Sequence, residues 1–197
     1  TLTFASEHYG RIARILAKGI PVTLEADVRN TFTGGNDSAF NILAELPGTD
    51  KADEVVMLGA HFDSFHFATG ATDNGVNVAV MMEAMRILKA SGVPLRRTVR
   101  LALWTGEEQG MLGSHAYVAR HFVDTVARVR RPDFAKLAAY YNLDNGGGAI
   151  RGPMVDQREQ LSTETDSTFR VWTRLMRDLG ADIVSARGGG GTDHVSF

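Results

Sequence analysis

The sequence predicts an α/β fold in which helices cover both faces of a mostly parallel, mixed central sheet, giving a three-layer sandwich. Strand-like and helix-like segments alternate along the chain, and no internal repeat is visible. Residues 55–60, 98–104 and 137–143 are mainly apolar runs, the pattern of inner strands covered on both faces. A chain of 197 residues with 44% hydrophobic content can form one sizeable core, so we expect one domain.

The first fifty residues are expected to form a helix followed by a hairpin. Apolar residues at helical spacing predict a helix over residues 5–18, and Gly19 ends it. Alternating apolar residues predict a strand over 22–28, and residues 40–46 form its expected partner. The cluster of glycines and polar residues at 33–37 is typical of a turn between them.

The later part of the chain, residues 51–197, is expected to be the core of the domain. A long helix over 73–90 has apolar residues on most sides and is predicted to be buried, ending before Gly92-Val93-Pro94. Further elements are a helix over 107–121, an amphipathic helix over 168–179, a short strand at 183–184, and a loop at Gly188–Gly191 near a substrate cleft.

Composition narrows the possible functions and ligands. The net charge is −2 and no Lys/Arg-rich run occurs, so nothing indicates binding to nucleic acid or to an anionic membrane. The apolar stretches are interrupted by polar and charged residues, so no transmembrane span is expected. Cysteine is absent, which excludes disulfides and thiolate ligands, so any metal would be held by His, Asp and Glu.

Imidazole and carboxylate groups follow the predicted inner strands. They are His61, Asp63, Asp73, Glu107, Glu108 and Asp144. In α/β sheets, ligands bind at the carboxyl ends of the strands, so these groups are expected at one edge. One imidazole and several carboxylates are what a pair of zinc ions needs. His66, five residues after His61, is interpreted as a loop residue or substrate contact.

Each of these groups also has a purely structural interpretation. Asp73 is a natural N-cap for the long helix, and the two interpretations are compatible if one oxygen caps while both reach metal. Glu107 and Glu108 are suited to the first turn of a helix, where the dipole favours acids. Asp144 also suits a simple turn. No Gly-x-Ser-x-Gly, P-loop, Gly-x-Gly-x-x-Gly or His-Glu-x-x-His motif offers a competing chemistry.

Three segments together resemble the co-catalytic di-zinc exopeptidases, a family that includes aminopeptidase Y, bacterial leucyl aminopeptidase and plasma glutamate carboxypeptidase. They are LGAHFDS at 58–64, GATDNG at 70–75 and LWTGEEQG at 103–110, with further similarity at NLDNG, 142–146, and GTDH, 191–194. The resemblance implies that His61 and Asp144 bind one zinc, that Asp73 bridges both ions and that Glu108 binds the other. It also implies that Asp63 orients His61 and that Glu107 is the general base.

The family's last zinc ligand is a histidine beyond the segment that ends at Phe197. His194 matches a different position, so the resemblance implies a C-terminally truncated catalytic domain that lacks one ligand. We expect one zinc or fewer in this chain and little activity. The family also implies more chain on both sides, a protease-associated domain in the parent protein, and an extracytoplasmic (periplasmic or secreted) location.

The resemblance implies a metallopeptidase that hydrolyses peptide bonds at a chain end, either as an aminopeptidase or as a dipeptidase or carboxypeptidase. Asp193 could hold a free amine and Arg187 a carboxylate, and the sequence ranks neither. Two alternatives remain open. One is a non-catalytic binding ectodomain on the same fold, and the other is acyl transfer of the glutaminyl-cyclase type.

Overall fold

The computed structural model describes residues 3–31, 38–144, 146–155, 163–185 and 191–197. The chain divides into two compact units, Thr1–Asp37 and Ser38–Phe197. The first unit contains α1 (Ser6–Leu16), as the periodicity predicts, and residues 20–31 form neither helix nor strand.

The predicted N-terminal hairpin is wrong. Residues 22–28 form no strand, and residues 23–28 are exposed. The segment expected to be their partner forms β1 (Ile42–Leu46), which pairs with β3 (Arg97–Trp104) instead. Alternation of apolar residues favours a strand only where a neighbouring strand accepts its hydrogen bonds. The predicted turn at 33–37 lies outside the described residues.

The second unit is built on a mixed sheet of four strands in the order β1-β3-β2-β6. β2 (Lys51–His61) is parallel to both β3 and β6 (Leu137–Asn142), whereas β1 is antiparallel at the edge. The apolar runs predict all three parallel strands, but only β2 and β3 are inner strands. β6 is an edge strand of the described sheet and has no fully buried residue, so the prediction that 137–143 is covered on both faces is wrong. The parallel register of the three strands pairs His61 with Trp104, and Gly59 with Asn142, so their carboxyl ends lie together.

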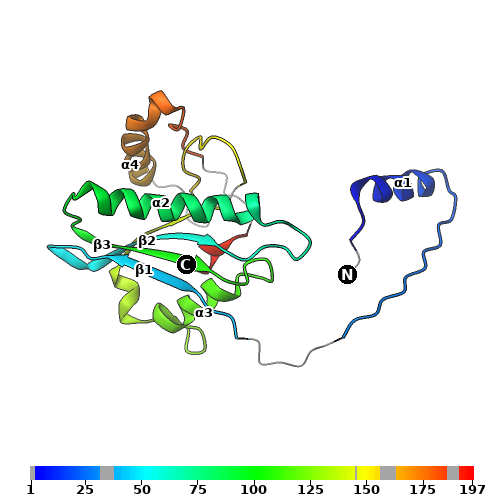
Figure 1. Ribbon diagram of the computed structural model, residues 1–197, viewed down its shortest axis with the longest axis horizontal. Helices are drawn as coiled ribbons and strands as arrows, with labels where there is room; N and C mark the ends of the chain where they lie inside the picture. The colour runs from blue at the N-terminus through cyan, green and yellow to red at the C-terminus, as the bar shows by residue number, and fades with distance from the viewer. Residues whose placement is uncertain (1–2, 32–37, 145, 156–162, 186–190) are drawn as a thin grey trace. The chain divides into compact units, whose positions relative to one another are not determined.

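Helices cover both faces of this sheet, which confirms the layered α/β architecture (Figure 1). On one face, Met81 and Met85 of α2 (Val76–Ser91) pack against Ala60, Leu101 and Leu103. The other face packs against α3 (Leu112–His121) and the segment after it. The buried residues on this face form a second core cluster, which consists of Val55, Met57, Ala102, Trp104, Tyr117, Val118 and Phe122.

Trp104 is the centre of the second cluster and is fully buried. Its indole N–H donates to the Tyr140 hydroxyl at 2.7 Å, and its ring lies 5.2 Å from Tyr117 and 6.0 Å from Phe197 between centroids. Phe197 stacks on Tyr140 at 4.0 Å. Through these contacts Phe197 packs against the sheet, together with η4 (Asp193–Ser196), which precedes it.

Two helices begin later than predicted, and both differences affect the site. α2 begins at Val76, after an irregular turn, η1 (Ala71–Gly75), that contains Asp73. α3 begins at Leu112, so Glu107 and Glu108 lie in the preceding turn. Gly106, Gly110 and Met111 have φ values of 65°, 109° and 58°, which an α-helix cannot accommodate.

The long helix is less buried than predicted. Only Asn77, Met81 and Met85 of α2 are buried, and apolar residues such as Val80 and Ile87 are about half exposed. Its end at Gly92, which has a left-handed conformation, is as predicted.

The remaining elements are short or combine two helix types. α4 (Thr163–Thr173) continues as the 3₁₀ helix η3 (Arg174–Leu179), so residues 168–179 are helical as expected. The predicted strand at 183–184 is not formed, and a single bridge joins Met154 to Ser185. The others are β4 (Val123–Asp124), β5 (Val129–Arg130) and η2 (Pro132–Lys136). Among the described residues, no helix combines the length and hydropathy that a bilayer crossing requires.

We expect Gly59→Ala to destabilise the sheet, because an added Cβ would overlap the Tyr140 hydroxyl and ring. Tyr140 is held by Trp104 and Phe197, so it cannot move without loss of those contacts. The free energy of unfolding, measured with urea, should fall by about 1–3 kcal/mol. Gly191→Ala is the control, because nothing lies within 4 Å of its added Cβ. Equal stability of the two variants would contradict this packing argument.

Candidate metal centre

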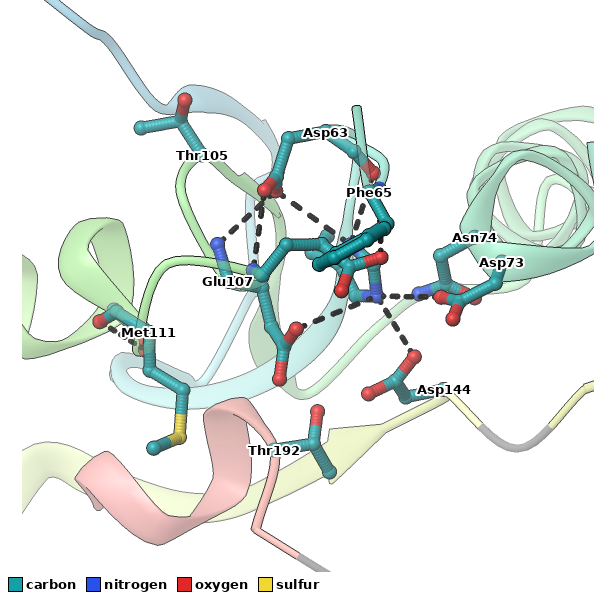
Figure 2. Close-up of polar contacts among 12 residues, drawn as sticks. Asp63, Phe65, Asp73, Asn74, Thr105, Glu107, Met111, Asp144 and Thr192 are labelled. Atoms are coloured by element: carbon teal, nitrogen blue, oxygen red, sulfur yellow. Dashed lines mark hydrogen bonds and ion pairs between the residues drawn. The ribbon is translucent and has the colours of Figure 1, made fainter. Parts of the chain in front are cut away.

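The acidic and imidazole groups that the sequence singles out come from neighbouring strand ends. His61 ends β2, Asp144 follows β6 by two residues, and Glu107 follows β3 by three. Asp73 lies in η1, immediately before α2. Figure 2 shows Asp73, Glu107 and Asp144 directed toward one point. The parallel order of the three strands therefore brings these groups together, as expected for this class of sheet.

His61, Asp73 and Asp144 form the centre of this group, here called the histidine–carboxylate cluster. The His61 imidazole is almost fully buried, with 1% of its surface exposed. Its Nε2 atom lies 2.8 Å from Asp144 Oδ1 and 3.0 Å from Asp73 Oδ1, and 3.9 Å from Glu107 Oε2. One ligand atom from each member of the cluster lies within 4.8 Å of the others.

The charges around this cluster fit a cation. Three carboxylates converge on a single imidazole nitrogen, which can donate one hydrogen bond at most. Carboxylate oxygen and imidazole nitrogen are both ligands that zinc accepts, and no thiolate is present in the chain. The donor set is therefore the one that a zinc ion would satisfy.

Burial and the neighbouring charges change two pKa values in the metal-free protein. Burial alone would lower the pKa of His61, but its hydrogen bond to Asp144 and the charges of Asp144, Glu107 and Asp63 raise it to about 9. Burial raises the pKa of Glu107 to about 7, with the charge of His61 opposing the rise. His61 is therefore protonated at neutral pH while no cation occupies the cluster.

Asp63 connects His61 to the turn that carries the two glutamates. Its Oδ1 and Oδ2 atoms accept the backbone N–H groups of Glu107 at 3.1 Å and Glu108 at 3.2 Å (Figure 2). The Nδ1 atom of His61 lies 3.1 Å from the Asp63 carbonyl oxygen and 3.5 Å from its Oδ1. The sequence resemblance implies only the second of these relations. The contact with the backbone of the glutamate turn emerges from the structure.

The two adjacent glutamates point to different partners, although they lie in a turn and not in a helix. Glu107 faces the His61 imidazole, whereas Glu108 Oε1 accepts the backbone N–H of Phe65 at 2.9 Å. Glu108 is not a member of the histidine–carboxylate cluster.

Asp73 does not cap α2, so that structural interpretation is wrong. The N-cap position is Gly75, and no side chain accepts a hydrogen bond there. The Asp73 side chain is 60% exposed. Its neighbour Asn74 is fully buried and donates from Nδ2 to the carbonyl oxygen of Leu143 at 3.1 Å. Sequence reasoning missed this role of Asn74, which joins the Asp73 turn to the strand end that precedes Asp144.

The segment near the C-terminus contributes one buried acid. Asp193 is fully buried, and neither of its oxygens meets hydrogen-bond geometry with a described group. Burial raises the pKa of Asp193 to about 6, opposed by the nearby Ser114 hydroxyl and by His61. A side chain without exposed surface cannot bind a substrate amine directly, so that candidate role is not supported. His194 is half-buried in η4 and is not a member of the cluster. His66 is exposed on a loop, while Arg187 and Gly188–Gly190 lie outside the described residues.

Comparison with known proteins agrees with this geometry. Residues 41–197 match the family model described as Peptidase family M28. Carboxypeptidase Q from Homo sapiens is 34% identical over 113 residues, which cover 57% of this chain and 24% of that protein. Aminopeptidase YwaD from Bacillus subtilis is 29% identical over 163 residues, covering 82% and 34%. The chain thus spans about a quarter to a third of the length of these relatives.

Two solved structures have the same fold. A peptidase M28 precursor from Shewanella amazonensis superposes with a TM-score of 0.64 at 30% identity, covering 78% of this chain and 32% of that one. BSAP, a zinc aminopeptidase from Bacillus subtilis, gives a TM-score of 0.59 at 28% identity, covering 80% and 36%. Since the family model covers most of the sequence and the sheet has the predicted mixed architecture, the chain belongs to peptidase family M28.

Proposed function

We propose that this protein is a zinc-dependent exopeptidase that hydrolyses the peptide bond at one end of a chain. The observation that carries the proposal is the convergence of His61, Asp73 and Asp144 on one point, with Glu107 beside them. Relatives named as an aminopeptidase and a carboxypeptidase support the reaction class, but they differ in the chain end that their names imply. The proposal therefore extends to both kinds of exopeptidase.

In this proposal His61, Asp73 and Asp144 hold one zinc. Asp73 is exposed enough to offer its second oxygen to another ion, which Glu108 would also bind. A bound zinc would polarise the scissile carbonyl and lower the pKa of a water molecule. From the described residues alone, we expect about one tightly held zinc per chain, because three ligands already lie together.

Glu107 is assigned as the general base. Its carboxylate lies 3.9 Å from His61 Nε2, beside the cluster but not part of it. It would accept a proton from the attacking water and later return it to the leaving amine. The pKa of about 7 belongs to the metal-free site, and a cation nearby would lower it, so the carboxylate would be ionised at neutral pH. Asp63 would position this residue through the backbone of its turn.

We extend the proposal to the whole protein on the basis of the family resemblance. Residues 51–197 would be the metal-site core of an exopeptidase domain that acts on peptides. The parent protein would carry a protease-associated domain and act outside the cytoplasm. The match of the family model from residue 41 onward supports the assignment of the core.

The first test is substitution of the base. In zinc-supplemented buffer, Glu107→Gln should lower kcat for dipeptide hydrolysis by about 10²–10⁴-fold, because the amide cannot accept the proton. Zinc content, measured by elemental analysis, should stay the same. Glu83→Gln is the matched control, since Glu83 pairs with Arg86 on the exposed surface of α2. Hydrolysis that a chelator does not reduce, or full turnover in Glu107→Gln, would contradict the proposed function.

The second test concerns Asp63. Asp63→Asn leaves one acceptor oxygen for two backbone N–H groups, so the Glu107 or Glu108 amide should exchange its hydrogen about 10–100-fold faster. Zinc affinity should fall by about 10–100-fold. Asp50→Asn, at an exposed pair with Arg96, should change neither quantity. If amide exchange and zinc affinity are unchanged in Asp63→Asn, the positioning role is wrong.

The third test uses pH. Zinc requires neutral imidazole, and the metal-free pKa of His61 is about 9, so binding must release a proton at any lower pH. The apparent association constant should therefore rise about tenfold per pH unit between pH 6 and 8, measured by competition with a chromogenic chelator. His61→Gln should remove tight binding, whereas His8→Gln, on α1, should preserve both affinity and slope. Affinity that is independent of pH would contradict the assignment of His61.

A further inference from the structure

The loop between Asp63 and Asp73 carries three consecutive aromatic side chains that the proposed mechanism does not use. Phe65, His66 and Phe67 are here called the aromatic stack. Phe65 is 44% exposed and Phe67 is 87% exposed, although both are large apolar side chains. Contiguous exposed aromatic surface is a feature of binding sites more than of ordinary protein surface.

The stack is ordered by contacts within its own loop. The ring centroids of Phe65 and His66 lie 4.7 Å apart, and those of His66 and Phe67 lie 4.3 Å apart. The Ala68 N–H donates to the Phe65 carbonyl oxygen at 2.8 Å, which closes a tight turn. At the base of the loop, a Cβ on Gly70 would lie 2.9 Å from the Ser64 Cβ, so the two ends of the loop are close together. The aromatic residues therefore project from a compact, narrow-based turn.

The stack is also joined directly to the candidate metal centre. The Phe65 N–H donates to Glu108 Oε1 at 2.9 Å, and Figure 2 shows Phe65 beside the groups of the centre. The two ends of the loop carry Asp63 and Asp73, so the position of the stack is set by the same residues that shape the centre.

We propose that the aromatic stack is a subsite for an apolar or aromatic side chain of the substrate, at a residue next to the scissile bond. The inference rests on the proposed function, because it needs a peptide at the centre. Aromatic faces and edges bind other rings and apolar groups well. The Glu108 carboxylate accepts the backbone N–H of Phe65, so this hydrogen bond does not involve the aromatic ring. Phe67 would be a specificity-determining residue, whereas Phe65 would in addition link the subsite to Glu108.

The test compares Phe-Phe with Ala-Ala as dipeptide substrates of the full chain with zinc. In Phe67→Ala, the ratio of kcat/KM for Phe-Phe over Ala-Ala should fall about five- to tenfold, because KM for Phe-Phe rises more than KM for Ala-Ala. Phe67→Leu should restore part of the ratio. Val126→Ala is the matched control, because Val126 is 93% exposed and follows β4 in sequence, far along the chain from the loop.

Binding is measured separately from turnover in the Glu107→Gln chain, by calorimetry with each dipeptide. Tighter binding of Phe-Phe than of Ala-Ala, reduced by Phe67→Ala, supports the subsite whether or not the unsubstituted chain hydrolyses either dipeptide. Full turnover in Glu107→Gln would contradict only the proposed function. Hydrolysis with an unchanged ratio in Phe67→Ala would overturn the subsite and leave the proposed function standing. Equal losses of kcat/KM for both dipeptides in Phe67→Ala would also overturn the subsite. The same holds if the chain self-associates and Phe67→Ala abolishes this association without changing the Phe-Phe to Ala-Ala ratio.

Discussion

The buried imidazole of His61 is the group on which the rest of the site depends. It is at the end of the inner strand β2, the imidazole is almost fully buried, and three carboxylates are directed at one of its nitrogens. Such a concentration of negative charge is costly in a protein interior unless a positive charge offsets it. In the metal-free protein the imidazolium supplies that charge, and a zinc ion would supply it in the working site. The same electrostatic requirement therefore explains both the raised pKa of His61 and the fit of a cation.

The surrounding structure serves to hold these charges in place. Asp63 joins the histidine to the glutamate turn, and Asn74 joins the Asp73 turn to the end of β6. Neither residue needs to touch a substrate to affect the reaction, because each acts through the backbone of a segment that carries a reactive group. The strands are rigid, and the irregular turns at their ends place side chains in directions that a regular helix does not allow.

The opposite sides of the sheet have different roles. The aromatic cluster around Trp104 packs α3 and the C-terminal residues against one face, so that Asp193 is buried close to the centre. On the other face α2 contributes few buried residues beyond Met81 and Met85, and the irregular turn η1, which precedes this helix, carries Asp73. The exposed aromatic loop lies between the residues of the centre along the chain, which is why a selective subsite and a metal site can share one short segment.

Much of this molecule follows from the sequence. Apolar runs of the right length indicated the three parallel strands, and the acids and histidine that follow those runs indicated the centre. The same runs could not show that β6 lies at an edge of the described sheet. Local pattern misplaced the partner of β1, the start of α3 and the role of Asp73. Strand pairing is decided by distant segments that compete for the same edge, and alternation at residues 22–28 cannot reveal that competition. Whether glutamates lie on a helix or in a turn depends on backbone conformations at Gly106, Gly110 and Met111. Asp63 accepts hydrogen bonds from the backbone of Glu107 and Glu108, which lie 44 and 45 positions further along the chain. Only the tertiary structure, through the parallel register of β2 and β3, could determine these contacts.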